Sequence, residues 1–99
     1  MKWSREEIER NHWKAVTLEI NVFITYVDCY RRTAPGVRYY VDCTSEQDAE
    51  LHKDLARDIL IALKYLKRME IGAYKTIVHM YKDDIRDAIK VYRESKAEA

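Results

Sequence analysis

The chain has 99 residues, 47% of them apolar and 35% charged, and its 18 Lys and Arg nearly balance 17 Asp and Glu. A chain of this length buries little more than about 60% of the surface of its unfolded state, so we expect one domain over residues 1–99 with a small core. The near-neutral charge argues against a protein that attracts nucleic acid or an anionic membrane through its overall field.

The composition also bears on cellular location. The longest apolar runs are far shorter than the roughly 20 residues that a membrane-spanning helix needs. The first seven residues contain no apolar segment typical of a secretory signal. We therefore expect a cytoplasmic protein without a membrane partner.

The first predicted element is a short helix over residues 4–13. Ser4 and Glu7 match a capping box, in which each side chain bonds a free backbone N–H at the start of a helix. Few side chains of this segment are apolar, chiefly Ile8 and Trp13. We therefore expect a surface helix that is held in place by these side chains and Trp3.

The second predicted element is a β-strand over residues 15–32. Apolar and polar residues alternate along residues 16–26, and this period of two is typical of a strand with one buried face. A helix is the alternative, because one series of apolar residues also has heptad spacing. We favour the strand because β-branched residues crowd the turns of a helix. The heptad series consists of Trp13, Val16, Ile20, Phe23, Val27 and Tyr30.

A second strand over residues 37–43 is predicted to complete a β-hairpin. Pro35 and Gly36 suit the central positions of a type II turn. With Ala34 opposite Val37, the apolar faces of the two strands coincide, which supports this register.

Two long helices are predicted to follow the hairpin. Thr44 and Gln47 form a second capping box, and Gly72 is the expected C-cap of the helix that it opens. The apolar stripe of this helix consists of Leu51, Leu55, Ile59, Ala62 and Leu66. The last helix is expected over residues 73–94, with its acids Asp83, Asp84 and Asp87 on a solvated face that pairs with Arg86 and Lys90.

The predicted fold class is therefore α+β, with a short N-terminal helix, a β-hairpin and two long antiparallel helices packed on the sheet. The first strand is longer than the second, and an unpaired apolar edge favours pairing with another chain. We expect a homodimer through an edge formed by Val16, Leu18, Ile20 and Val22. The alternative is that this part of the strand bends over the helices and is covered by the N-terminal helix.

The hairpin tip is the predicted contact surface for a partner. It combines arginines, which pair with phosphate and stack on bases, with tyrosines that offer stacking platforms. In the alternative interpretation, one tyrosine face belongs to the core and the arginines only keep an exposed ribbon soluble. The residues concerned are Tyr30, Arg31, Arg32, Arg38 and Tyr40.

Cys29 and Cys43 flank the turn and are the candidate disulfide pair. The preferred register places them on opposite faces, so a bridge requires a bulge or a three-residue loop, and we favour two buried thiols over the disulfide. Neither these cysteines nor the three histidines have the spacing of a metal site. We predict no metal, cofactor or catalytic residue, because no nucleophile, base and oxyanion donor combine at a known spacing.

Many charges and only three Asn and Gln residues are typical of proteins from hyperthermophiles. In length and composition the chain resembles the small orphan proteins of filamentous viruses that infect hyperthermophilic archaea. That resemblance implies a virus-encoded accessory protein in the host cytoplasm. We therefore expect a heat-stable, non-enzymatic interaction or assembly protein, a homodimer with an unidentified protein partner. The alternative function is nucleic-acid binding by the hairpin tip.

Overall fold

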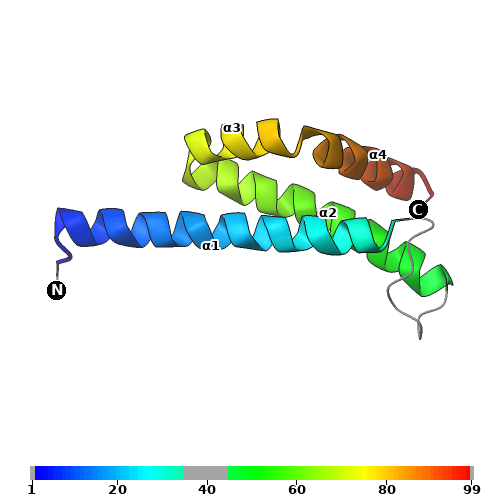
Figure 1. Cartoon of the computed structure of the whole chain (residues 1–99), viewed down its shortest axis with the longest axis horizontal. Helices are drawn as coiled ribbons and strands as arrows, with labels where there is room; N and C mark the ends of the chain where they lie inside the picture. The colour runs from blue at the N-terminus through cyan, green and yellow to red at the C-terminus, as the bar shows by residue number, and fades with distance from the viewer. Residues whose placement is uncertain (1, 35–44, 99) are drawn as a thin grey trace.

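The computed structural model describes residues 2–34 and 45–98 and contains four helices there. Figure 1 shows α1 along one edge of the molecule, α2 beside it, and α3 and α4 following one another back along α2. The described residues contain no strand, so the prediction of an α+β fold with a β-hairpin and a sheet is wrong. The helices are α1 (Arg5–Arg32), α2 (Ser45–Met69), α3 (Ile71–Met80) and α4 (Lys82–Glu98).

Residues 15–32, predicted as a strand, form the larger part of the single helix α1. The heptad series favours the helix over the strand in this segment. Four of its members are buried in the core, namely Val16, Phe23, Val27 and Tyr30. Burying each of these side chains stabilises the fold by about 1.5–3 kcal/mol. Helix propensity differs among ordinary residues by less than about 0.7 kcal/mol per residue, so core packing outweighs the preference of β-branched residues for strands.

Two threonine hydroxyls of α1 are satisfied within the helix itself. The hydroxyl of Thr17 donates to the backbone carbonyl of Trp13 at 2.8 Å, and that of Thr25 donates to the carbonyl of Asn21 at 2.8 Å. Each hydroxyl thus finds its acceptor one turn back along the same helix.

The predicted capping box at the start of α1 is confirmed. The Glu7 backbone N–H donates to the Ser4 hydroxyl at 3.2 Å, and the Ser4 backbone N–H donates to the Glu7 carboxylate at 3.3 Å. The helix then continues past Trp13, where the sequence was expected to change to a strand. The predicted turn and second strand, with Arg38, Tyr40 and Cys43, lie outside the described residues.

The core lies where α2 contacts α1 on one side and α3 and α4 on the other. The predicted stripe of α2 is largely confirmed, since Leu55, Ile59, Ala62 and Leu66 are buried, although Leu51 is exposed. The rings of Phe23 and Tyr81 meet edge to face, with centroids 5.3 Å apart.

Gly72 is not the C-cap that was predicted, because α2 already ends at Met69. Glu70 has an extended backbone and caps α3 instead, its carboxylate accepting from the Gly72 N–H at 3.3 Å. Glutamate is not among the preferred N-cap residues, so the sequence carries little signal for this corner. The predicted final helix is also divided at Tyr81, which separates α3 from α4.

Candidate functional site

A polar network joins the C-terminal end of α1 to α4. Tyr30, predicted at an exposed hairpin tip, is instead a buried residue of α1 whose hydroxyl donates a hydrogen bond to the Asp87 carboxylate. Burial, followed by this hydrogen bond, raises the pKa of the Tyr30 hydroxyl above its ordinary value of 10.0. The phenol therefore stays protonated and acts as a fixed donor between the two helices.

Arg31 makes the second link of this network. Its Nε donates to Oδ1 of Asp84 at 3.0 Å and its Nη2 donates to Oδ2 of the same carboxylate at 2.7 Å, a bidentate pair. The hydrogen bonds to Asp84 raise the pKa of Arg31. The guanidinium also lies 6.0 Å from the ring centroid of Tyr81. Asp84 and Asp87 were expected to pair with Arg86 and Lys90, and the structure pairs them with α1 instead.

His52 of α2 completes the network. The buried Thr33 hydroxyl donates to the Tyr30 carbonyl at 3.0 Å and lies 2.9 Å from Nδ1 of His52. Because the only hydroxyl proton of Thr33 is used on the carbonyl, Nδ1 of His52 is the donor of the second bond. The imidazole stacks on the Tyr30 ring at 4.1 Å between centroids, and burial lowers its pKa.

The chemistry of this network is structural. Every buried side-chain polar atom in the described part of the chain has a hydrogen-bond partner. Among the same residues, no three His, Cys, Asp or Glu side chains are placed so that they could hold a metal ion. The network therefore fixes the end of α1 against α2 and α4 by hydrogen bonds, an ion pair and ring stacking. Of the other predicted tip residues, Arg32 is exposed at the last position of α1.

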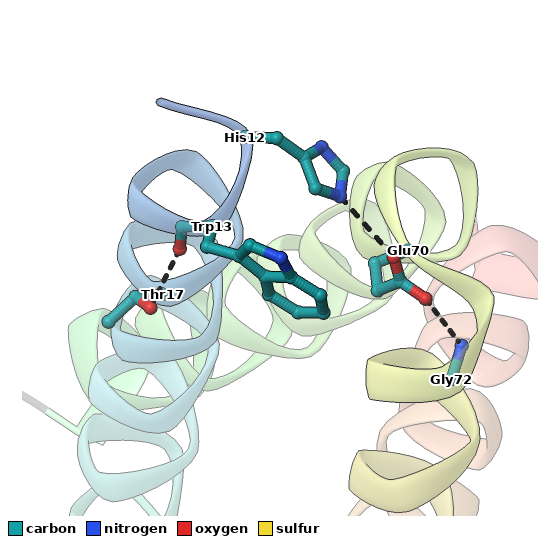
Figure 2. A network of polar contacts seen from close by, with 5 residues as sticks. All are labelled: His12, Trp13, Thr17, Glu70 and Gly72. Atoms are coloured by element: carbon teal, nitrogen blue, oxygen red, sulfur yellow. Dashed lines mark hydrogen bonds and ion pairs between the residues drawn. The ribbon is translucent and has the colours of Figure 1, made fainter. Parts of the chain in front are cut away.

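A second, smaller set of contacts holds the first half of α1 against the corner between α2 and α3 (Figure 2). His12 Nε2 lies 3.3 Å from Oε2 of Glu70, the residue that also caps α3. The half-exposed Trp13 projects toward the same corner and forms one wall of an open hollow on α1. The other residues lining the hollow are Arg10, Lys14 and Thr17.

A second heptad stripe, which we call the outer stripe, follows α1 on a side that contacts the core only at its last member, Cys29. Its members recur at steps of three and four, as those of the core stripe do, but they lie about a third of a turn away around the helix. Leu18 is 65% exposed and Ile8 56%, and neither belongs to the core cluster. The outer stripe consists of Ile8, Asn11, Ala15, Leu18, Val22, Thr25 and Cys29.

The predicted dimer edge is divided between the two stripes. Val16 is buried and Ile20 packs against the core, whereas Leu18 is exposed and Val22 half-exposed on the outer stripe. A strand would have placed all four on one face, but helical geometry separates residues two apart by about 200°. Cys29 ends the outer stripe and is half-buried, and its predicted pairing with Cys43 involves a residue outside the described range.

Sequence reasoning did not find the outer stripe. Its residues are visible in the sequence as a second series at steps of three and four that begins at Ile8. The prediction divided this series between a short helix over residues 4–13 and a strand over residues 15–32.

No family model, no curated protein and no solved structure matches this chain. Within the described residues, none of the helices combines the length and apolarity needed to cross a membrane.

Proposed function

We propose that the protein is a non-enzymatic assembly protein that works as a homodimer, in which the outer stripes of two α1 helices pair side by side and in parallel. One observation carries this proposal. A single helix has two heptad stripes, and the core of its own chain covers one of them but reaches only Cys29 at the end of the other, whose residues Ile8 and Leu18 stay exposed. The partner of the second stripe is then a second copy of the same helix.

The first half of α1 shows most clearly what a partner would add. Residues 5–15 include no buried side chain, although they make up about 16 Å of helix. Ile8 and Trp13 are large apolar residues that remain about half exposed there, as does Trp3 just before the helix. Pairing along the outer stripe removes the apolar surface of Ile8 and Leu18 from water, at about 25 cal/mol for each Å² buried.

The residues of the outer stripe favour a parallel pair. Its first heptad position is occupied by Ile8, Ala15 and Val22, and the fourth by Asn11 and Leu18. A β-branched residue at the first position with Leu at the fourth, as at Ile8, Val22 and Leu18, favours two-stranded parallel coiled coils. In a parallel pair, the two Asn11 amides meet and bond each other.

The charges beside the seam support the same orientation. In a parallel pair, a residue just before the first heptad position lies near the residue five positions later on the other helix. Lys14 of one copy therefore lies near Glu19 of the second copy. An antiparallel pair that aligns Ile8 with Leu18 instead brings the two Lys14 side chains to the same level, where they repel.

The arrangement of the helices leaves room for this pairing. Figure 1 shows α3 and α4 on one side of α1, while α2 crosses α1 obliquely, so that the first turns of α2 lie on the other side. The core stripe faces these helices, while the outer stripe lies about a third of a turn away. We propose that the second copy approaches along the exposed part of the outer stripe, around Ile8 and Leu18, which leaves the core of each subunit intact.

The proposal is tested by measuring mass in solution with light scattering across protein concentrations. The wild-type chain is expected at twice the monomer mass of 11.9 kDa. Leu18→Asp places a charge in the seam and is expected to yield a folded monomer. Met80→Asp is the matched control, because Met80 is also 65% exposed on a helix but lies outside the outer stripe.

A wild-type monomer at all concentrations would overturn the proposal. Equal loss of the dimer in Leu18→Asp and Met80→Asp would overturn the assigned surface. Circular dichroism of each variant verifies that the helices persist, so that a lower mass reports dissociation and not unfolding.

A further inference from the structure

A straight row of basic side chains follows the exposed side of α3 and α4, and we call it the basic row. Its members recur at steps of three or four residues, which places those of each helix on one face. All of them are exposed, and Figure 1 shows the two helices following one another along the same side of α2. The basic row consists of Lys75, His79, Lys82, Arg86, Lys90 and Arg93.

The acids of α4 do not neutralise this row. Asp84 binds Arg31 and Asp87 accepts from Tyr30, so both carboxylates are held on the side of α4 that faces α1. Asp83 and Glu94 are exposed and flank the row. Among the described side chains, none of the five lysines and arginines in the row has an acid within 4 Å.

We propose that the basic row binds the phosphate backbone of a double-stranded nucleic acid. Within α4 the row extends from Lys82 to Arg93 over about 16 Å, with a cation every 5 to 6 Å or so. Each strand of a duplex presents a phosphate about every 3.4 Å along its axis. The regularly spaced Lys and Arg side chains of α4, with Lys75 of α3 beyond them, can therefore contact several phosphates of one duplex at once.

The side chains in and beside the row favour a duplex over a membrane or a single strand. An interfacial helix inserts apolar residues beside its basic ones. Here the neighbouring Ile89 and Val91 pack against the core of the protein instead. Single-strand binding relies on aromatic side chains that stack on bases, and the basic row contains no Phe, Tyr or Trp. Backbone contacts without base contacts carry no sequence information, so the binding is not sequence-specific.

The strength of this binding follows from the number of phosphates neutralised. The row has five permanent cations. A plot of the logarithm of the binding constant against the logarithm of the salt concentration is therefore expected to have a slope of about −4 to −5. Because the whole chain has a net charge of only +1, no long-range field adds to this local effect. Binding is therefore expected in dilute salt and is lost as ionic strength rises.

The test measures fluorescence anisotropy of labelled 20-base-pair DNA and RNA duplexes of mixed sequence, titrated with the protein at several salt concentrations. The triple variant Lys82→Ala, Arg86→Ala, Lys90→Ala removes three cations of the row. It is expected to weaken binding in dilute salt about tenfold or more and to reduce the slope by about 3. The matched control removes three cations from the start of the chain, through Lys2→Ala, Arg5→Ala and Arg10→Ala, and leaves binding within about twofold.

Binding of either duplex with this pattern supports the proposal, and the two duplexes show whether DNA or RNA is preferred. The proposal is overturned if neither duplex binds in dilute salt, or if the control variant loses as much affinity as the row variant. It is also overturned if only a single strand binds, or if vesicles of anionic phospholipid bind and duplexes do not.

This inference is independent of the homodimer. The row variant keeps the outer stripe intact, so its mass in solution should equal that of the wild-type chain. Leu18→Asp keeps the row intact and should still bind the duplex, although with weaker apparent affinity where two subunits contact one duplex.

Discussion

His52 shows how a single residue can acquire its role from residues distant in the sequence. Its imidazole is bound by Thr33 and stacked on Tyr30, both from the end of α1. Nothing around His52 in the sequence indicates these partners, and the spacing of the three histidines was informative only in excluding a metal site. The network makes this residue a contact between helices with a lowered pKa.

The lowered pKa of His52 predicts a pH dependence of stability. When pH falls below the ordinary value of 6.5, the unfolded chain takes up a proton before the folded chain does, so the free energy of unfolding decreases. His52→Asn keeps a donor near Nδ1 but has no ionisable group. We expect its free energy of unfolding to decrease less than that of the wild type between pH 7.5 and pH 5.

Urea denaturation at the two pH values measures this difference. His79→Asn, which removes an exposed imidazole, is the control and should follow the wild type. An equal decrease in His52→Asn and the wild type would contradict the predicted role of burial.

At the scale of the element, the two apolar stripes of α1 explain why its sequence alternates between apolar and polar residues as a strand does. The core stripe contributes Val16 and Ile20, and the outer stripe contributes Leu18 and Val22. Two heptad series offset by two residues place apolar residues at positions 16, 18, 20 and 22, and Ile24 and Tyr26, which belong to neither series, extend the alternation. An alternation of period two thus arises from a helix that has apolar residues on two sides. The predicted capping box and the stripe of α2 were correct because each depends on a single helix surface.

The helical state of α1 predicts a definite order of stability at Asn21, which is exposed in the middle of the helix. Asn21→Ala should raise the free energy of unfolding by about 0.5 kcal/mol, because Ala has the highest helix propensity. Asn21→Gly should lower it by a few tenths of a kcal/mol, and Asn21→Pro by about 3 kcal/mol or more.

Chemical denaturation followed by circular dichroism ranks these variants. A strand would show a different order, because Ala is disfavoured in strands. A destabilised Asn21→Ala variant would therefore argue against the helix.

At the scale of the whole molecule, the near-neutral charge of the chain conceals an uneven surface. The sequence has almost equal numbers of acids and bases in each third, and this balance led to the expectation of weak phosphate binding. The fold separates the two signs, because Asp84 and Asp87 are bound on the α1 side of α4 while the basic row lies on an exposed side. The spacing of the row was visible in the sequence, but the positions of the acids were not.

The proposed dimer predicts that two charges can be exchanged without loss of assembly. Lys14→Glu and Glu19→Lys each place like charges across the parallel seam, so each should raise the dissociation constant by about twofold or more. The double variant restores opposite charges and should restore the wild-type constant. Sedimentation at low ionic strength measures all four proteins. Failure of the double variant to recover would contradict the parallel orientation.

The sequence by itself determined the local features: a capping box at Ser4, the apolar stripe of α2, and the heptad positions along α1. These depend on residues within a few turns of one another, whose interactions do not require the rest of the fold. Only the tertiary structure decided that residues 15–32 are helical and that Tyr30 and Arg31 bind α4. The physical reason is that burial against α2 outweighs local propensity, and that carboxylates more than fifty residues away satisfy the polar groups at the end of α1.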